Sequence, residues 1–334
     1  MASIVQHFKA VFIEARFTPF VVSIGVLAMR GILFHFQGVP ENVLPDTSFL
    51  WQYFAPYFAH PIVSFVSGTM FVFLTAVLIS NLNNRFSLIR TRTNLPFIVP
   101  ILLFSLHPYF LAMTPNYVAI VLLLIALHSL LASYQQPDTQ LNSFRAAILI
   151  GVAGLFQVYA LLLLPIWWRG EVAMRGVQLK SFFTSIFGIV LVYLSVFSIY
   201  FLIGNVQGFL APFQHFVQIS LLDTYHFAVV QWISITFVFV FFVLYMLLSL
   251  NISVRAKVLT QSGIKFVAAV IALFLVFQAV YWEKTLFFFL MNIALISYLA
   301  AYYHSIATAK SHVWLALTMT IVLGGVYLLN CFVF

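Results

Sequence analysis

Apolar runs of about 20 residues follow one another along almost the whole chain, and they constrain its fold more than any other feature. A run of this length, coiled as a helix, crosses the roughly 30 Å hydrocarbon core of a bilayer. Of the 334 residues, 64% are hydrophobic and 7% are charged, whereas about 25% of the residues of a soluble domain are charged. The sequence therefore predicts an all-α, polytopic membrane protein that forms a single transmembrane domain over residues 1–334.

We expect about nine of these runs to be full spans. Their length matches a bilayer, and short polar or basic turns separate them. The expected spans are residues 17–36, 61–80, 95–113, 117–134, 181–202, 228–250, 266–281, 286–303 and 313–334.

Three further segments are predicted to lie at the membrane surface. Apolar residues recur at helical spacing within residues 1–16, which indicates a short interfacial helix. Residues 37–60 and 203–227 are longer than a turn requires and are rich in aromatic residues. Aromatic side chains favour the membrane interface, so we expect both loops to be amphipathic and to lie on the outer side.

Residues 145–169 decide the topology, because this apolar segment lies between two basic ones. Lys and Arg concentrate in cytoplasmic loops. If the segment folds back as a re-entrant hairpin, 13 of the 15 Lys and Arg residues are cytoplasmic, all except Arg30 and Lys284. We therefore expect a hairpin with legs of about 11 residues, each reaching about 16 Å or half the bilayer, and with its tip near residues 156–159. The N-terminus is then cytoplasmic.

The basic balance of the chain does not indicate a nucleic-acid partner. The net charge is +8, but the basic residues are scattered singly between apolar runs, as anchors that face an anionic membrane leaflet would be. A phosphate-binding Gly-rich loop is missing, which argues against a nucleotide-driven pump. The expected spans carry no acidic residue at their centre, which weakens the case for an ion-coupled transporter.

The order of parts between Asn81 and Phe197 points to a family. It comprises a basic turn at residues 83–85, a span that ends at His107-Pro108, a short return span, and an apolar segment from Gly151 to Arg169. This order, over about a third of the chain, resembles the GT-C superfamily of integral-membrane glycosyltransferases. The chain is also similar to an uncharacterised family of bacterial polytopic inner-membrane proteins, which brings no known activity with it. The resemblance implies a GT-C-like architecture and a sugar donor carried on polyprenyl phosphate at the outer face.

The GT-C resemblance also implies an acidic pair in the first outer loop, where this chain has Glu41 and Asp46. These are the catalytic candidates, either as a general base or as ligands of a divalent cation. The chain departs from the family pattern after His107-Pro108, where Asn116 stands in place of an acid. The Pro-Asp-Thr-Ser sequence at residues 45–48 is equally typical of a helix start, with Asp46 or Thr47 as the cap. Histidine spacing does not indicate a metal site either, because no two histidines lie four residues apart.

The candidate substrate-binding residues are Arg30, His107, Asn116, Gln157 and Tyr159. Arg30 lies six residues from the outer end of its span, so its side chain could extend to the interface or hold a lipid phosphate. His107 would line an outer cavity or cap a broken helix, and with Asn116 it would border the donor. Gln157 and Tyr159, at the hairpin tip, would either bind a sugar hydroxyl or satisfy freed backbone groups.

Three functions stay open at this point. The first is a transferase that moves a sugar or similar group from polyprenyl phosphate at the outer face of a bacterial inner membrane. The second is a non-catalytic membrane subunit, or degenerate GT-C relative, with a membrane protein as partner in an envelope complex. The third is a transporter or flippase of a lipid-linked substrate. All three imply a membrane lipid as partner.

Overall fold

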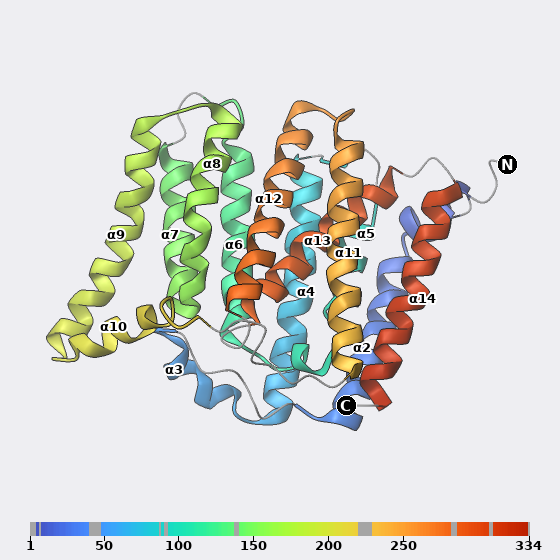
Figure 1. Ribbon diagram of the computed structural model, residues 1–334, viewed down its shortest axis with the longest axis horizontal. Helices are drawn as coiled ribbons and strands as arrows, with labels where there is room; N and C mark the ends of the chain where they lie inside the picture. The colour runs from blue at the N-terminus through green and yellow to red at the C-terminus, as the bar shows by residue number, and fades with distance from the viewer. Residues whose placement is uncertain are drawn as a thin grey trace.

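The computed structural model describes residues 5–6, 8–39, 48–86, 88–89, 93–136, 140–219, 229–281, 286–306 and 310–332, and over these residues the protein is all-helical, as predicted. Eight described helices are long and apolar enough to cross a membrane, so the chain is a multi-pass membrane protein (Figure 1). They are α2 (Thr18–Gln37), α4 (Pro61–Phe86), α6 (Pro115–Ala132), α9 (Leu179–Leu202), α11 (Val229–Ser253), α12 (Val258–Val280), α13 (Phe287–Ser305) and α14 (Lys310–Phe332).

The bundle has two chemically different ends. Apart from Arg30, the described Lys and Arg residues lie at one end or within about two helical turns of it, and we call this the basic end. The N-terminus lies at the basic end, and the C-terminus lies at the opposite end (Figure 1).

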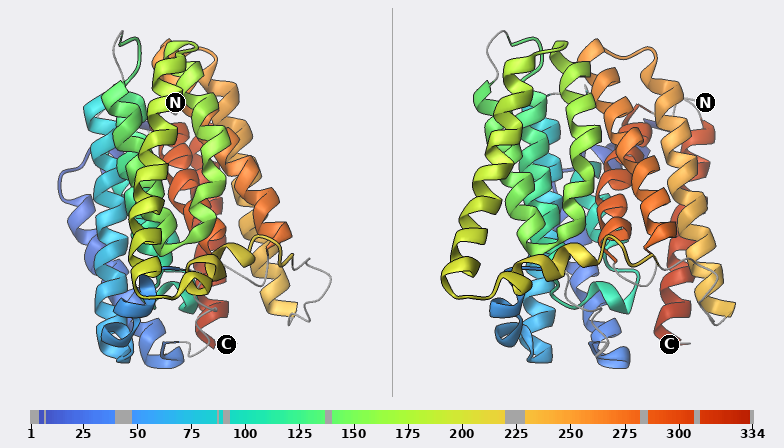
Figure 2. Two further views of the ribbon diagram at one scale, coloured as in Figure 1. Left: turned by 90° about the vertical axis from the view of Figure 1, so that its left-hand side faces the viewer. Right: turned by 60° about the vertical axis from the view of Figure 1, so that its left-hand side comes forward.

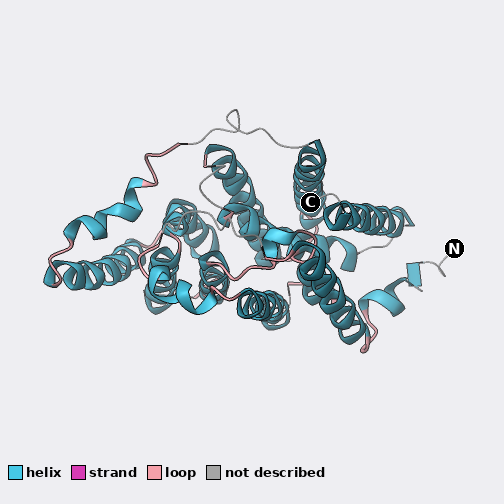
Figure 3. Ribbon diagram, turned by 90° about the horizontal axis from the view of Figure 1, so that it is seen from below, coloured by secondary structure: helices cyan, strands magenta, loops and turns pink. Residues whose placement is uncertain are grey.

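Helix α13 lies at the centre of the bundle. It packs against α5 (Leu95–Leu103), α11 and α12. Of the 18 residues in its most apolar stretch, 94% are buried. A helix that is apolar on all sides, as α13 is, is expected to be enclosed by other helices. Helix α9 forms one edge of the elongated bundle, and α2 and α14 pack together at the other, as the view from below shows (Figure 3).

One expected span is broken. Helix α5 covers only nine residues of the expected span 95–113, which is about 13 Å of rise and less than half of the bilayer. Its continuation is irregular apart from the short 3₁₀-helix η3 (Pro108–Phe110). Pro108 has no backbone N–H to donate and holds His107 in an extended conformation, which prevents a continuous helix. The described part of the chain thus has eight helical spans and one broken crossing, where the sequence predicts about nine full spans.

The segment predicted to fold back does so. Helix α7 (Gln140–Phe156) runs away from the basic end, and the 3₁₀-helix η4 (Val158–Leu163) with α8 (Leu164–Arg175) returns to it (Figure 1). The predicted leg length is wrong, because α7 has 17 residues and rises about 26 Å, which is more than half of the bilayer. The sequence placed the tip correctly, since α7 ends at Phe156.

Short helices occupy the three predicted surface segments. Helices α3 (Trp51–Phe54) and η2 (Ala55–Phe58), followed by α10 (Val206–Gln214), lie across the opposite end of the bundle (Figure 2). At the basic end, residues 9–13 form a short π-helix, η1 (Lys9–Ile13). Ile13 is buried, and its carbonyl accepts a hydrogen bond from the Asn94 backbone N–H at the start of α5.

Candidate functional site

Arg30 is buried inside the bundle and does not reach the interface, so the expectation of an extended, interfacial side chain is wrong. Its exposed fraction is 0%. The guanidinium donates from Nη1 to the Phe104 carbonyl at 2.8 Å and from Nη2 to the Phe110 carbonyl at 3.0 Å, while Nε donates to Thr69 Oγ1 at 2.9 Å. Arg30 therefore joins α2 to α4 and to both sides of the break that follows α5.

The broken span explains why a charged side chain lies here. Helix α5 ends before the bilayer is crossed, so its continuation has backbone groups without helical partners. Side chains from four different helices supply these partners, beginning with Arg30 from α2. The others are Tyr117 Oη, which donates to Phe110 O at 2.7 Å, Asn330 Nδ2, which donates to Leu106 O at 2.9 Å, and Ser64 Oγ, which accepts from Met113 N at 2.9 Å.

A glycine lets α4 lie directly against this backbone. A Cβ atom at Gly68 would be 2.5 Å from the Leu111 carbonyl oxygen, a distance that real Cβ atoms do not adopt. The close approach brings Ser64 and Thr69, which lie within one turn of Gly68, into contact with the broken span and with Arg30.

His107 caps the short helix η3. Its Nδ1 accepts a hydrogen bond from the Tyr109 backbone N–H at 3.2 Å, and its ring stacks on the Tyr109 ring at 5.1 Å between centroids. Of the two roles that the sequence left open for His107, the structure shows the capping of a broken helix. In the sequence, His107 lies between Phe104 and Phe110, whose carbonyls accept hydrogen bonds from Arg30.

Asn116 and Gln157 meet where the hairpin tip touches the start of α6. Gln157 Nε2 donates to Asn116 Oδ1 at 2.8 Å, and the two residues are 4% and 6% exposed respectively. Gln157 is extended, with φ −146° and ψ 104°, because the chain leaves α7 and reverses there. The pair therefore ties the reversal of the hairpin to α6.

Tyr159 ties the tip to the loop that follows α10. Its hydroxyl donates to the His215 carbonyl at 3.2 Å, and its ring packs against those of Phe216, Tyr281 and Phe288. The residue is fully buried. Tyr159 therefore connects the return leg of the hairpin to the residues that directly follow α10.

Glu41 and Asp46 lie outside the described residues, which resume at Ser48. Ser48 Oγ accepts a hydrogen bond from the Trp51 backbone N–H at 2.9 Å, so this hydroxyl meets the first turn of α3. The Phe49 and Leu50 backbone N–H groups both donate to the Leu155 carbonyl, at 2.9 and 3.1 Å. The chain directly after the acidic segment is thereby held on the hairpin tip.

The structure thus brings the five predicted binding residues into two neighbouring assemblies. Arg30 and His107 belong to the broken span, while Asn116, Gln157 and Tyr159 belong to the hairpin tip. Tyr117, next to Asn116, links the two assemblies through the Phe110 carbonyl. Within the described residues, no group of three or more His, Cys, Asp or Glu side chains could hold a metal ion.

Sequence reasoning missed several residues that complete these assemblies, among them Ser64, Thr69, Tyr117 and Asn330. Each is a polar residue inside an apolar span, and a polar side chain in a span usually has a partner in the bundle interior. That signal was present in the sequence, but the partners here are backbone carbonyls and N–H groups, which only the break in the span makes available.

Comparisons of this chain with protein-family models, with curated proteins and with solved structures find no match.

Proposed function

We propose that this protein is a GT-C-like transferase that takes a sugar or similar group from a polyprenyl-phosphate carrier at the outer face of a bacterial inner membrane. The positive-inside rule supports the orientation, because the described Lys and Arg residues other than Arg30 gather at the basic end, which would face the cytoplasm. The opposite end, with α3, η2 and α10, would then face outward.

One observation supports the proposal: the described residues on either side of the acidic segment lie at the end of the bundle opposite the basic end (Figure 1). Before it, α2 ends at Gln37 with Gly38 in a left-handed conformation, at φ 68°. After it, Ser48 and the residues that follow are bonded to α3 and to the hairpin tip. Glu41 and Asp46 belong to the stretch of sequence between these points.

The chemistry assigned to the acids is general-base catalysis or cation binding. Asp46 would take the proton of an acceptor hydroxyl as the hydroxyl oxygen bonds to the anomeric carbon, and the bond to the carrier phosphate would break with its electron pair leaving on the polyprenyl phosphate. If a divalent cation is used, Glu41 and Asp46 would supply carboxylate ligands for it. Arg30, His107, Asn116, Gln157 and Tyr159 would shape this site as a rigid support, because their described contacts are internal.

Those internal contacts also favour a second candidate, a non-catalytic membrane subunit. Each of the five described candidate residues makes a hydrogen bond to another part of the chain. A subunit without catalytic activity would keep these internal hydrogen bonds, whereas replacing Glu41 or Asp46 would not change its function. The two candidates therefore differ in what they require of Glu41 and Asp46.

The test measures group transfer in reconstituted vesicles. The purified protein is placed in liposomes with a panel of polyprenyl-phosphate-linked sugars, and release of the free carrier is followed for wild type, Asp46→Asn and Glu41→Gln. We expect the Asp46 variant to lose about 100-fold or more of the rate, because a positioned base contributes about 10²–10⁴. Glu14→Gln, a carboxylate at the basic end, is the matched control and should retain the wild-type rate.

A wild-type protein that releases no carrier from any donor, or an Asp46 variant that is as active as wild type, would overturn the transferase proposal. In the first case, a membrane protein that co-purifies equally with wild type and with the Asp46 variant would support the subunit candidate. Unfolding midpoints of all variants, measured in the same detergent, separate a lost rate from a lost fold.

A further inference from the structure

Two exposed basic residues, one on α8 and one on α12, lie well away from the ends of their helices. Arg169 is six residues before the last residue of α8, and Lys265 is seven residues after the first residue of α12. At 1.5 Å per residue, each lies roughly 9–10 Å from the basic end of its helix. Both side chains are exposed, so both belong to the surface of the bundle that would contact lipid.

The two helices touch at the level of these residues. Helices α8 and α12 pack against each other, and a Cβ atom at Gly170 of α8 would collide with the Phe266 ring of α12. Arg169 comes directly before Gly170, and Lys265 comes directly before Phe266. Because α8 runs toward the basic end and α12 runs away from it, Arg169 and Lys265 lie at nearly the same depth (Figure 1).

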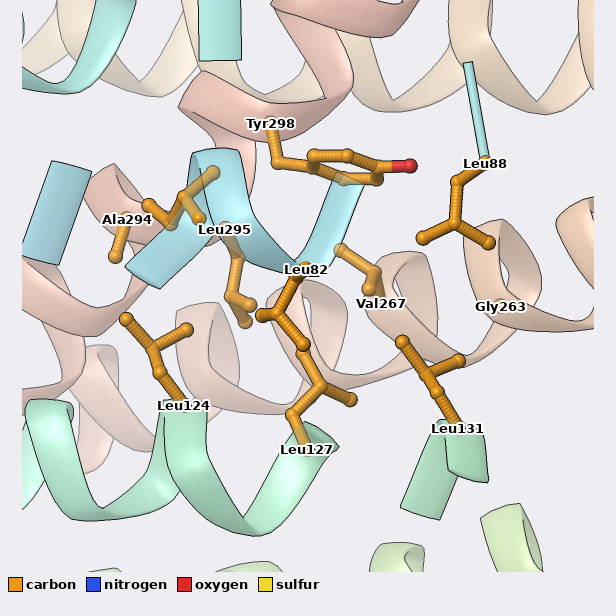
Figure 4. A pocket seen from close by; sticks show the side chains of 11 residues that line it. Leu82, Leu88, Leu124, Leu127, Leu131, Gly263, Val267, Ala294, Leu295 and Tyr298 are labelled. Atoms are coloured by element: carbon orange, nitrogen blue, oxygen red, sulfur yellow. The ribbon is translucent and has the colours of Figure 1, made fainter. Parts of the chain in front are cut away.

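On α12, the residues on either side of Lys265 show where its side chain points. Gly263 and Val267 face the interior of the bundle, where they line a small apolar cavity together with Leu131 of α6 (Figure 4). Residues two positions apart on a helix lie about 200° apart around its axis. Lys265 is two positions from both Gly263 and Val267, so its side chain is directed away from the interior.

Arg169 has the same relation to the buried face of α8. Trp167 and Glu171, each two positions away from it, are 3% and 6% exposed. Each basic residue therefore faces outward and precedes the contact residue of its helix by one position. In an antiparallel pair, this register places both side chains on the same side of the plane that contains the two helix axes. Arg169 and Lys265 thus share one flank of the α8–α12 pair.

This flank carries positive charge without a matching acid. Among the residues of α8, α9, α11 and α12, Glu171 is the one acid, and it is bonded to Arg175 at 2.7 Å. No hydrogen bond or ion pair joins Arg169 or Lys265 to another described residue. An unpaired cation that faces hydrocarbon is costly, so an anion from outside the chain would stabilise this arrangement.

We propose that Arg169 and Lys265 together bind the phosphate of one anionic glycerophospholipid from the leaflet at the basic end. The long stems of both side chains can extend along the helices toward the headgroup level. The planar guanidinium can hold two phosphate oxygens, and the ammonium adds a point charge. Basic sites between helices on the cytoplasmic side bind anionic headgroups, and this pair lies at the end that we propose to be cytoplasmic.

The residues closer to the middle of the membrane suit the acyl chains of the same lipid. Ala272 and Val276, both exposed, continue the face of α12 that carries Lys265. Helix α12 has 23 residues and rises about 34 Å, only about 4 Å more than the hydrocarbon core, so Lys265 originates below the surface of that core. A glycerophospholipid supplies both the acyl chains at this level and the phosphate above them, whereas a free phosphate ion supplies only the phosphate.

The experiment measures lipid binding to the delipidated full-length protein in detergent. Native mass spectrometry counts the bound lipids and gives a dissociation constant during titration with phosphatidylglycerol. The comparison ligands are phosphatidylcholine with the same acyl chains, polyprenyl phosphate, and inorganic phosphate added as a competitor. We expect one phosphatidylglycerol to bind about tenfold or more tightly than phosphatidylcholine, and inorganic phosphate not to displace it.

Single variants decide whether both residues hold the same lipid. Arg169→Gln and Lys265→Gln should each weaken the tightest phosphatidylglycerol site about tenfold or more, since each removes a charge-assisted hydrogen bond to one phosphate. Lys265→Arg keeps the charge and should bind like wild type. Arg145→Gln is the matched control, because Arg145 is an exposed arginine five residues after the first residue of α7. The unfolding midpoints of the lipid-free variants should equal that of wild type, because the replaced side chains are exposed.

Several results would overturn the inference. Equal binding of phosphatidylglycerol and phosphatidylcholine would remove the anionic headgroup from the site, and displacement by inorganic phosphate would make it a site for free anions. Tighter binding of polyprenyl phosphate that Arg169→Gln abolishes would assign the pair to the carrier.

The variants can contradict the shared site in two further ways. Unchanged affinity of either glutamine variant, or loss of a different lipid in each, would show that the two residues do not hold one phosphate. A loss of the same size in Arg145→Gln would make the effect one of overall charge. The Asp46 variants test group transfer separately, so the failure of one proposal leaves the other standing.

Discussion

A buried arginine is costly in a membrane protein, and Arg30 shows how hydrogen bonds to other described residues compensate for that cost. The three atoms that accept its hydrogen bonds are two backbone carbonyls and a threonine hydroxyl. Charge-assisted hydrogen bonds are about twice as strong as neutral ones, and the planar guanidinium can reach separate acceptors at once. Arg30 therefore compensates for its own desolvation and for the carbonyls that the broken span leaves free.

Replacing Arg30 should destabilise the protein. Arg30→Met keeps the length of the side chain but leaves the Phe104 carbonyl without this partner, and we expect a loss of about 2–4 kcal/mol in the free energy of unfolding. Arg30→Lys should lose less, because an ammonium keeps the charge but lacks the fork that reaches both carbonyls. Unfolding in mixed micelles with increasing denaturing detergent measures both variants against wild type.

The same variants separate the structural role from the phosphate-binding role suggested by the sequence. A phosphate ligand would make Arg30→Met as stable as wild type in the absence of lipid, and would abolish stabilisation by added polyprenyl phosphate. Equal unfolding free energies for Arg30→Met and wild type would therefore contradict the role that we assign to Arg30.

Single residues also show where sequence reasoning stops. An arginine inside an apolar span is conspicuous in the sequence, and Arg30 was identified there. Its partners were not, because the Phe104 and Phe110 carbonyls accept from a side chain only where the helix is interrupted. Glu41 and Asp46, the proposed catalytic pair, lie outside the described residues, so their assignment stays a prediction.

At the scale of elements, the hairpin depends on close packing between α7 and α9. A Cβ atom at Gly154 of α7 would collide with the Tyr193 hydroxyl of α9 and would lie 3.1 Å from Leu161 of η4. Tyr193 Oη is buried and has no hydrogen-bond partner among the described residues. Glycine is therefore required at the point where the tip region of the hairpin meets α9.

A double-mutant cycle tests this contact. Gly154→Ala should destabilise the protein by about 1–3 kcal/mol, because the extra methyl group overpacks the site. Tyr193→Phe removes the nearest atom and should restore part of that loss, so the two changes should not be additive. Gly151→Ala, one turn away on α7, is the matched control, since its Cβ would meet Val192 at an ordinary 3.4 Å. Additive effects of the two changes would contradict the contact.

The hairpin also shows what charge patterns can and cannot predict about an element. The basic residues on both sides of residues 145–169 predicted that this segment reverses its direction, and α7, η4 and α8 form such a hairpin in the structure. The depth was underestimated, because the helix begins at Gln140 and its polar first turn hides the start of the leg. The prediction that residues 95–113 form one continuous span was wrong for a related reason. Hydropathy measures whether a segment can lie in the membrane, but Pro108 decides whether it is helical there.

At the scale of the whole molecule, the number of membrane crossings before a loop determines on which side of the membrane that loop lies: the side changes with each crossing. The eight helical spans and one broken crossing that the structure describes bring the two ends of the chain to opposite ends of the bundle (Figure 1). The hairpin adds no change of side, since the Gln135 backbone N–H, before α7, donates to the Met174 carbonyl near the end of α8, at 3.4 Å. At the same end, Arg175 bonds both Ser143, at 2.6 Å, and Glu171, at 2.7 Å.

Single cysteines introduced into a Cys331→Ser background test this topology. Cys331 is the chain's one native cysteine, and it is buried. Gln136→Cys and Val177→Cys place thiols before and after the hairpin, both at exposed positions of the basic end, and Val217→Cys places one at an 82% exposed position of the opposite end. With a membrane-impermeant maleimide, we expect Val217→Cys to react in spheroplasts, whereas Gln136→Cys and Val177→Cys should react only in inverted vesicles. Reaction of the two hairpin positions from opposite sides would show that residues 140–175 cross the membrane once, and every loop after them would change sides.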